Sequence, residues 1–517
     1  MSKKKNRIAL NIIVKNEEKF LRGCLESIRN LVDEIVIADT GSTDSTVAIA
    51  SEYTDKILHF QWTNDFAEAR NFVLDNTESE WVLYLDADER IAKKYHKVIK
   101  HFVESNIADV FLLKLKSEIF KKGGNEVHII QYPRLFRRIP QARFEGRIHE
   151  QITPSLSRAG QKFVGTDIII EHLGYAQGDE ILEQKKYRNL ELLKEQVESE
   201  PDNFYALYQL GQNYITLSDW ENGVAYLYKS LEQKNITPSI KASIYLLLAK
   251  HMQNDKNYKE AIDLCENALK IAPSHLYGKV LLAEILFFDG KFDESIQLLE
   301  EAYKLSIIPE EARKIEGAID ISYEPYFIQY IMAQRYRFSE KNDKAIEAYK
   351  KVLFHKKNHY ESNFGLAVIY FNEQLPEDAI SQLENIKLNE IEDKSLLLDI
   401  AGLYIELGKN LETRKVLERV LEIDKENAKA LFFLGNTYLD ETNYDKAEEY
   451  YLKSYNADSS VKETILNLAF ISIKKQDYSK ALEYYKKLHS MFPTDESFAR
   501  KVIALELKIQ QIQIPNQ

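Results

Sequence analysis

Residues 81–90 read W-V-L-Y-L-D-A-D-E-R, and this stretch decides the fold of the N-terminal part of the chain. Five large apolar residues, Trp81 to Leu85, predict a buried central strand. Asp86-Ala87-Asp88 follows at once. Because side chains alternate in an extended chain, both carboxylates are expected on one side of the strand's carboxyl end, where open α/β sheets bind ligands. Such a pair suits Mg²⁺ or Mn²⁺ shared with a phosphate-bearing ligand, and a solvated acidic turn is the alternative.

Strand and helix patterns alternate around this stretch. Strands are expected at residues 8–14, 35–38 and 56–60, and helices open near residue 17, at residue 47 and at residue 66. This alternation implies right-handed crossovers and a mainly parallel sheet. Polar residues then gather at three strand ends along one edge, namely Asn16 and Glu17, Asp39, and Asp86 with Asp88.

Bulk properties limit the class of protein. A chain of 517 residues argues for more than one domain. The net charge of −12 argues against a broad nucleic-acid surface. Two distant cysteines support neither a disulfide framework nor a cysteine metal site. We expect a cytoplasmic protein without a signal core, a membrane span or a nucleic-acid partner.

Four short motifs in the first part of the chain occur as an ordered set. They are V-x-N-E at residues 14–17, A-D-x-G-S-T-D at 38–44, A-R-N at 69–71 and D-x-D at 86–88. The set resembles the family-2 glycosyltransferases, bacterial examples included, over about the first third of the chain. The resemblance implies an α/β GT-A fold, which is Rossmann-like. It also implies a nucleotide-sugar donor, a divalent metal ion and inversion at the anomeric carbon.

Beside this resemblance, five residues are assigned to the nucleotide sugar. Asp39 is placed to accept a hydrogen bond from the imide N–H of a pyrimidine such as uracil, and a helix-entry cap is its alternative. Glu17, with Asn16, is assigned to the base or ribose. The alternative for Glu17 is an acidic residue in the first turn of a helix, where the helix dipole favours it. Arg70 is assigned to the diphosphate or else to an ion pair, and Asp86 to ribose or metal-bound water.

The metal ion, Mn²⁺ or Mg²⁺, is expected at Asp88, with Asp86 as a second acidic ligand. GT-A enzymes often supply a C-terminal histidine as an additional ligand. His172 ends an expected short strand and occupies the corresponding place, with a purely structural histidine as the alternative. The metal would offset the charge that builds on the departing nucleotide diphosphate.

Transfer to a hydroxyl or thiol needs a base that reaches the attacking proton. In similar transferases an acidic residue after the D-x-D strand plays this part. The segment F-E-G-R-I-H-E at residues 144–150 offers Glu150 as the first choice, Glu145 as the second and His149 as the third. A cap or ion pair is the alternative for Glu150.

A basic run from Lys114 to Arg147 contains Arg134 within Y-P-R-L-F-R-R. Next to a pyrophosphate this run would supply neutralising charge, and otherwise it is a solvated face. The residues alone leave both interpretations open.

The rest of the chain repeats with a period of 34 residues. This period resembles the tetratricopeptide repeat and predicts an all-α solenoid. We expect a GT-A domain at residues 1–183, a helical linker at 184–202, and about eight repeats with a capping helix at 203–517. A longer step after Ala283 predicts an insertion near residues 307–323. The small residues expected where paired helices meet are Gly211, Ala249, Ala283, Ala333, Ala367, Ala401, Gly435 and Ala469, with Gly223, Ala261, Ser295, Ala345, Ala379, Thr413, Ala447 and Ala481 twelve positions later.

Three functions are compatible with these features. The first is a metal-dependent inverting glycosyltransferase that moves a sugar from UDP-GlcNAc or UDP-Glc to a protein or peptide recruited by the repeats. The second is transfer to a lipid-linked or cell-surface glycan. The third is a non-catalytic repeat scaffold whose N-terminal domain senses nucleotide sugar. The repeats could also mediate homo-oligomerisation. The sequence identifies neither the sugar nor the acceptor atom.

Overall fold

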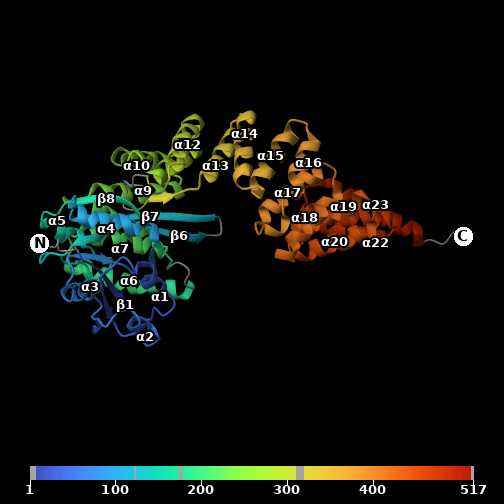
Figure 1. Ribbon diagram of the computed structural model, residues 1–517. Coiled ribbons are helices and arrows are strands. Elements are labelled where there is room, and N and C mark those ends of the chain that lie inside the picture. The colour runs from blue at the N-terminus through green and yellow to red at the C-terminus, as the bar shows by residue number, and fades with distance from the viewer. Residues whose placement is uncertain (1–6, 122–123, 174–178, 310–311, 313–319, 514–517) are drawn as a thin grey trace, which may run out of the picture. The chain divides into compact units, whose positions relative to one another are not determined.

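The structure is a computed structural model in which residues 7–121, 124–173, 179–309, 312 and 320–513 are described. The chain folds into two compact units, Met1–Arg335 and Tyr336–Gln517. The first holds the α/β sheet and the first helical repeats, and the second holds helical repeats only (Figure 1).

One mixed sheet of nine strands organises the first unit. Its order is β3-β2-β1-β4-β7-β6-β8-β5, with β9 paired to β7. β1 to β4 are parallel, as the sequence predicts, whereas β7 runs antiparallel to both β4 and β6. The expected α/β class is therefore confirmed, with a parallel part followed by a mixed part. The strands are β1 Ile8–Val14, β2 Glu34–Asp39, β3 Ile57–His59, β4 Trp81–Tyr84, β5 Glu89–Ile91, β6 Val110–Lys121, β7 Gly124–Arg137, β8 Phe163–His172 and β9 Asp320–Ser322.

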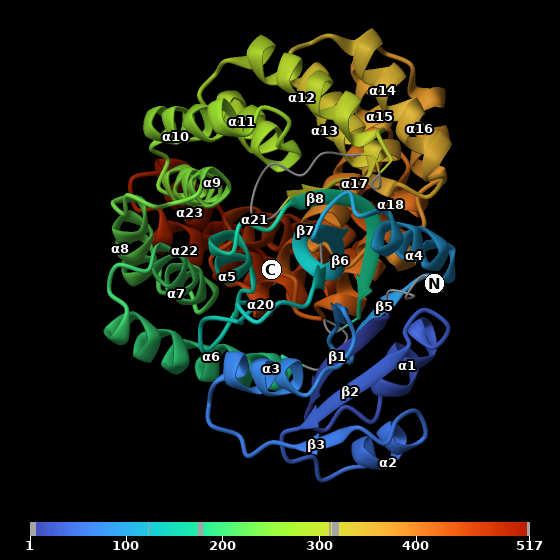
Figure 2. The same cartoon turned by 60° about the vertical axis from the view of Figure 1, so that its left-hand side comes forward.

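Helices cover both faces of this sheet. Trp81 and Leu83 of β4 face a core that includes residues of α1, α2 and α4, and Val82 and Tyr84 face a core that includes residues of α3 and α5. Figure 2 shows α3 on one side of β1 and β2, and α1 with α2 on the other. The helices of this part are α1 Leu21–Ile28, α2 Thr46–Ser51, α3 Phe66–Asp75, α4 His96–Ser105 and α5 Thr153–Arg158, with a 3₁₀ turn at Lys93–Tyr95.

The D-x-D segment departs from the extended geometry expected of it. β4 ends at Tyr84, and residues 87–88 form a turn that leads into β5. Because β5 pairs with β8, this turn brings Glu89 opposite His172. The two carboxylates of the motif therefore have different neighbours.

The repeats follow the predicted register. The first small residue of every pair lies in one helix and the second in the next, and all sixteen are buried. Ser295 replaces the usual alanine and donates its hydroxyl to the Ala283 carbonyl, at 2.5 Å. The helices are α6 Asp179–Ser199, α7 Phe204–Thr216, α8 Trp220–Leu231, α9 Pro238–Asn254, α10 Tyr258–Ile271, α11 Leu276–Phe288, α12 Phe292–Ser306, α13 Pro325–Phe338, α14 Asn342–His355, α15 Tyr360–Asn372, α16 Pro376–Glu384, α17 Lys394–Glu406, α18 Asn410–Ile423, α19 Ala428–Asp440, α20 Tyr444–Ala457, α21 Lys462–Lys474, α22 Tyr478–Met491 and α23 Glu496–Gln513, with a 3₁₀ turn at Leu388–Glu390.

The predicted insertion separates α12 from α13. Residues 310–311 and 313–319 of this segment lie outside the described residues. Its last part forms β9, which adds to β7 in antiparallel register, with Val127 opposite Ser322. A segment between repeats thus extends the sheet of the first unit.

Glu34, the first residue of β2, is a buried carboxylate with a structural role. It accepts hydrogen bonds from Lys56 Nζ, at 2.8 Å, and from the backbone N–H and hydroxyl of Ser79, at 2.8 and 2.6 Å. Burial alone raises the pKa of this carboxyl, but the hydrogen bonds from Lys56 and Ser79 outweigh it and lower the pKa from 4.5 to about 2. Its ionised form therefore ties β2 to the loop before β4.

Replacing Glu34 by Gln is expected to lower the free energy of unfolding at pH 7 by about 2 kcal/mol. Because the folded-state pKa lies below the ordinary value, this stabilisation is complete above about pH 4.5 and is lost as the pH falls toward 2. Urea denaturation at pH 7, 4.5 and 3 checks this. Glu52→Gln, which removes an exposed pair with Arg22, serves as the control with little change. A difference from wild type that stays constant across pH would contradict the assignment.

Replacement of two glycines in the second unit by alanine is expected to change the stability of the fold in opposite directions. A Cβ atom on Gly435 would lie 2.5 Å from the Tyr451 ring, whereas one on Gly402 would meet nothing within 4 Å. Gly435→Ala is expected to cost about 2 kcal/mol through overpacking, and Gly402→Ala to add about 0.5–1 kcal/mol through helix propensity. Thermal denaturation of the two variants measures both. A rise in the melting temperature of Gly435→Ala as well as of Gly402→Ala would show that the Tyr451 ring does not resist the added methyl group.

Candidate active site

The loop after β2 is closely tied to the end of β1. Asn16 has a positive φ of 56°, and its side-chain oxygen accepts from the Thr43 N–H at 2.7 Å. Its own N–H donates to the Ser42 hydroxyl at 3.0 Å. Asp39 is 5% exposed and accepts from the N–H groups of Gly41 and Ser42 at 3.3 and 3.0 Å. A carboxylate has about four acceptor sites, so these two bonds leave capacity for a ligand.

Arg70 of α3 connects the D-x-D motif to the predicted base. Its Nη2 donates to Asp86 Oδ1 at 2.7 Å, and its Nε donates to Glu150. The guanidinium is 5.0 Å from the Tyr84 ring centroid and 5.7 Å from that of Phe144. Arg70 is 7% exposed and Glu150 has a 12% exposed side chain, whereas the Asp86 side chain is 40% exposed. Arg70 therefore forms ion pairs with both Asp86 and Glu150.

Arg134 of β7 lies on the other side of Asp86. Its Nη2 is 2.6 Å from Glu89 Oε1 and 3.6 Å from Asp86 Oδ2, and its guanidinium is 4.5 Å from the Tyr84 ring centroid. Burial raises the pKa of the Glu89 carboxyl to about 7, although Arg134 opposes this shift. Desolvation alone would also raise the pKa of the Asp86 carboxyl, but Arg70 and Arg134 hold that pKa well below its usual range.

An irregularity in β7 places Arg134. Phe111 and Leu113 of β6 face Leu135 and Tyr132, so β7 holds one extra residue at this point. Such a bulge redirects side chains, and Pro133 is compatible with it because proline has no N–H to pair. Arg134 therefore projects toward the same buried region as Tyr84.

Asp88 and His172 form a separate pair. Asp88 Oδ2 lies 3.3 Å from His172 Nε2, and the two side chains are 16% and 22% exposed. The hydroxyl of Ser117 is 3.0 Å from His172 Nδ1, a contact that orients the ring. In the described part of the chain no group of three or more His, Cys, Asp or Glu side chains is placed to hold a metal ion. One carboxylate and one imidazole nevertheless fit Mg²⁺ or Mn²⁺, which commonly take few protein ligands and complete their shell with phosphate and water.

The loop that carries Glu150 is anchored from α3. Asn71 bonds in both directions with the backbone of Phe144, at 2.9 and 3.0 Å, and the Phe66 N–H donates to the Arg147 carbonyl at 2.8 Å. The Glu150 side chain is 12% exposed and is held by Arg70. Within the A-R-N motif, Arg70 thus contacts the Glu150 side chain, and Asn71 contacts the loop that carries Glu150.

The two other candidate bases have different surroundings. Glu145 pairs with Arg158 of α5 and shares backbone hydrogen bonds with Gln151. His149 is exposed and has a positive φ of 53°. Among the described contacts, Glu150 alone of the three candidates is joined to the D-x-D motif through Arg70.

The structure thus brings most predicted site residues to one edge of the sheet. Asp86, Arg70 and Glu150 form one group and Asp88 with His172 a second, while Asn16 and Asp39 frame the neighbouring loop, and Glu17 donates its N–H to the Thr46 hydroxyl. Sequence reasoning missed Glu89 entirely and left Arg134 undecided within a basic run. Arg134 and Phe136 are two positions apart in the strand, so they point to the same face of β7. The apolar Phe136 was therefore a signal in the sequence that Arg134 lies on a buried face.

Comparison with known families agrees with this geometry. Residues 10–156 match the model described as glycosyl transferase family 2. Residues 254–303 match a tetratricopeptide repeat model, and residues 322–504 match a model described as the tetratricopeptide repeat protein 21 C-terminal ARM domain. The chain carries a family 2 glycosyltransferase domain followed by tetratricopeptide repeats.

Similar curated proteins include both glycosyltransferases and repeat proteins. A TPR repeat-containing protein of Synechococcus elongatus is 29% identical over 51% of this chain and 66% of its own length. The SPbeta prophage-derived glycosyltransferase SunS of Bacillus subtilis is 28% identical over 43% of this chain and 53% of its own length. The lipopolysaccharide core biosynthesis glycosyltransferase LpsC of Rhizobium meliloti is 26% identical over 41% and 80%. The chain therefore spans between half and two thirds of the first two relatives.

None of the helices among the described residues is both long enough and apolar enough to cross a bilayer.

The buried charges predict a measurable coupling between Arg134 and Glu89. Arg134→Met is expected to cost about 3 kcal/mol of stability, because it leaves a buried carboxylate without its partner. Adding Glu89→Gln in the same chain should recover at least half of this loss. Urea denaturation of the two single variants and the double variant measures the coupling.

Arg137→Met is the matched control on the same strand, because its partner Asp109 and its own side chain are about one third exposed. A small loss is expected there. Strictly additive losses for Arg134→Met and Glu89→Gln would show that the two residues do not stabilise each other.

Proposed function

We propose that the protein is a metal-dependent inverting glycosyltransferase that moves a sugar from UDP-GlcNAc or UDP-Glc to a protein or peptide acceptor recruited by the repeats. The observation that carries this proposal is the Asp88–His172 pair, 3.3 Å apart, at the sheet edge that also holds the Asp39 loop. A family 2 domain over residues 10–156 supports the reaction class.

The donor would lie across the ends of β1, β2 and β4. Asp39 retains acceptor capacity for the imide N–H of a uracil base, and Asn16 and Glu17 border the same loop. Asp86 would contact ribose or metal-bound water at the end of β4. Parallel sheets bind nucleotides at this edge because their loops converge there.

A divalent cation would be held by Asp88 and His172, and would supply Lewis-acid stabilisation of the leaving diphosphate. Arg70 and Arg134 are already paired with carboxylates. The charge balance also supports a metal ion. The two guanidiniums are paired with the carboxylates of Asp86, Glu150 and Glu89, so they leave little positive charge to neutralise a diphosphate.

Glu150 would act as the base. Direct displacement at the anomeric carbon forms a bond to the acceptor oxygen or sulfur as the bond to the diphosphate breaks, and the acceptor proton passes to a carboxylate. Arg70 fixes the Glu150 side chain through Nε while it holds Asp86 through Nη2. One guanidinium thus links the donor end of the site to the acceptor end.

The repeats favour a polypeptide acceptor, because stacked helical pairs present extended surfaces that suit chain segments. A glycan acceptor is the second candidate, and the similarity to a glycosyltransferase of lipopolysaccharide core biosynthesis favours it. Incubation with UDP-sugars and cell extract separates the two. A polypeptide that gains the mass of a hexose or N-acetylhexosamine supports the first, and a labelled glycan or lipid supports the second.

Replacing Asp88 by Asn is expected to lower Mn²⁺- or Mg²⁺-dependent release of UDP from the donor by about two orders of magnitude, because the metal loses its charged ligand. His172→Ala should raise the concentration of Mn²⁺ needed for half-maximal activity. UDP release is measured against added metal after treatment with a chelator.

Glu171→Gln is the control, because Glu171 is an exposed carboxylate on the same strand as His172. Equal UDP release by wild type, Asp88→Asn and the control would exclude the metal assignment. A wild-type protein that binds nucleotide sugar but releases no UDP would instead support the non-catalytic scaffold.

A further inference from the structure

The loop that carries Glu150 packs against the first helices of the repeat region. Ile148 is 6% exposed and shares a hydrophobic cluster with Leu193 of α6 and Leu210 of α7. Arg147 pairs with Glu195 at 3.0 Å. These contacts join the loop to the repeats within one compact unit.

Gln151 makes the most specific of these contacts. One amide of this side chain donates from Nε2 to the His149 carbonyl, at 3.2 Å, and to the hydroxyl of Tyr205, at 3.1 Å. The Gln151 amide therefore links the backbone of His149, on the other side of Glu150, to the Tyr205 hydroxyl. Since His149 has a positive φ, a conformation that is costly for a residue other than glycine, its surroundings must hold it.

Tyr205 is itself rigidly placed. It lies in the first turn of α7, where Asn203 caps the helix by accepting from the N–H groups of Tyr205 and Ala206. Its hydroxyl also accepts from Gln209 Nε2 at 2.9 Å. The hydroxyl is thus fixed by the helix before it receives the bond from Gln151.

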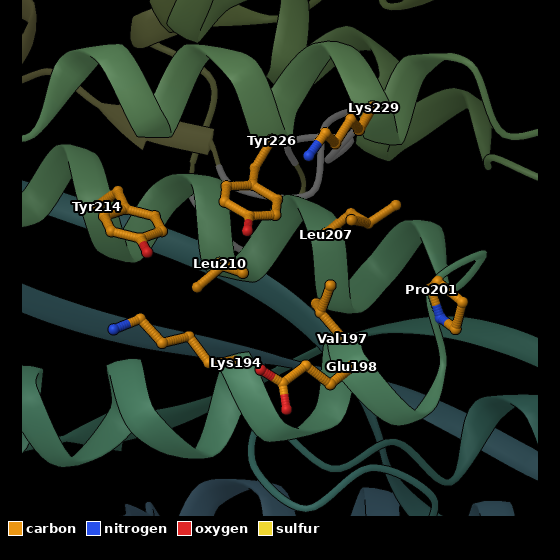
Figure 3. Close-up of a pocket in the computed structure, with 9 residues that line it drawn as sticks. All are labelled: Lys194, Val197, Glu198, Pro201, Leu207, Leu210, Tyr214, Tyr226 and Lys229. Carbon is orange, nitrogen blue, oxygen red and sulfur yellow. The ribbon is translucent and has the colours of Figure 1, made fainter.

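The α6 helix separates this contact from a groove on its other side. Gln196 faces Gly146 of the loop, whereas Lys194 and Glu198, two positions to either side of it, line a groove of about 520 Å³ with Tyr214 and Tyr226 (Figure 3). Positions two residues apart on a helix point in nearly opposite directions. Tyr214 of α7 also packs against the cluster that contains Ile148, but its ring stacks on Tyr226 and no hydrogen bond among the described contacts joins its hydroxyl to the loop.

We propose that Tyr205, on the first repeat helix, is a positioning residue for Glu150, acting through Gln151. The repeat region then completes the active site in addition to recruiting the acceptor. This inference rests on the proposed function, because it assigns to Glu150 the role of the base.

The test compares Tyr205→Phe, Gln151→Met and the double variant in the full chain. Each single change removes the Gln151–Tyr205 hydrogen bond, and Tyr205→Phe also removes the bond from Gln209 while Gln151→Met also removes the bond to His149. Each is expected to lower kcat for UDP release from UDP-GlcNAc or UDP-Glc with Mn²⁺ by about 3- to 10-fold. The KM for the donor should stay within about 2-fold, because no donor contact changes. The double variant should lose no more than either single variant.

Tyr214→Phe is the matched control and should retain wild-type kcat. Unchanged kcat in Tyr205→Phe, an effect on donor KM alone, or losses that multiply in the double variant would each overturn the inference. Wild-type protein that releases no UDP would overturn the proposed function instead.

Hydrogen exchange tests the positioning contact without relying on turnover. Backbone amides of residues 145–151 are expected to exchange about 3- to 10-fold faster in Tyr205→Phe than in wild type or Tyr214→Phe, because the loop loses its anchor. Equal exchange in all three proteins would overturn the inference whatever the activity.

Discussion

The site depends on Asp86 being held between two guanidiniums. Arg70 comes from α3 and Arg134 from a bulge in β7, and both contact the ring of Tyr84 at the end of β4. Neither arginine could be buried without a carboxylate partner, and Glu89 could not be buried without Arg134, whereas the Asp86 side chain is 40% exposed. Three elements far apart in the sequence are therefore fixed against one another before any ligand binds. The Glu150 loop is fixed through the same Arg70.

Local patterns predicted much of this arrangement. β1 spans the residues expected of it, α3 runs from Phe66 to Asp75, and β8 ends at His172. These predictions hold because apolar runs, caps and the strand–helix alternation are properties of short segments. The repeat register was predictable for the same reason, since a small residue is needed wherever two paired helices touch and the need recurs every 34 residues.

The partners of the site residues could not be predicted in the same way. Arg134 reaches Asp86 because of an extra residue in β7, and a bulge is defined only by pairing with a neighbouring strand. The turn at residues 87–88 gives the two carboxylates of the D-x-D motif different neighbours, which strand alternation alone could not show. Glu89 continues an acidic run and looks solvated in sequence, yet it is 1% exposed.

The glycosyltransferase family match ends at residue 156 and the repeat matches begin at residue 254, but packing does not follow that division. α6 and α7 bury apolar side chains together with Ile148 of the Glu150 loop, and β9, which belongs to an insertion between repeats, pairs with the strand that carries Arg134. The first repeats thus contact both the loop that holds the proposed base and the strand that supports the D-x-D motif. A change in these helices consequently acts on the site through packing, whether or not a polypeptide ever binds to the repeats. In this chain the sheet and the first repeats therefore pack as one compact unit.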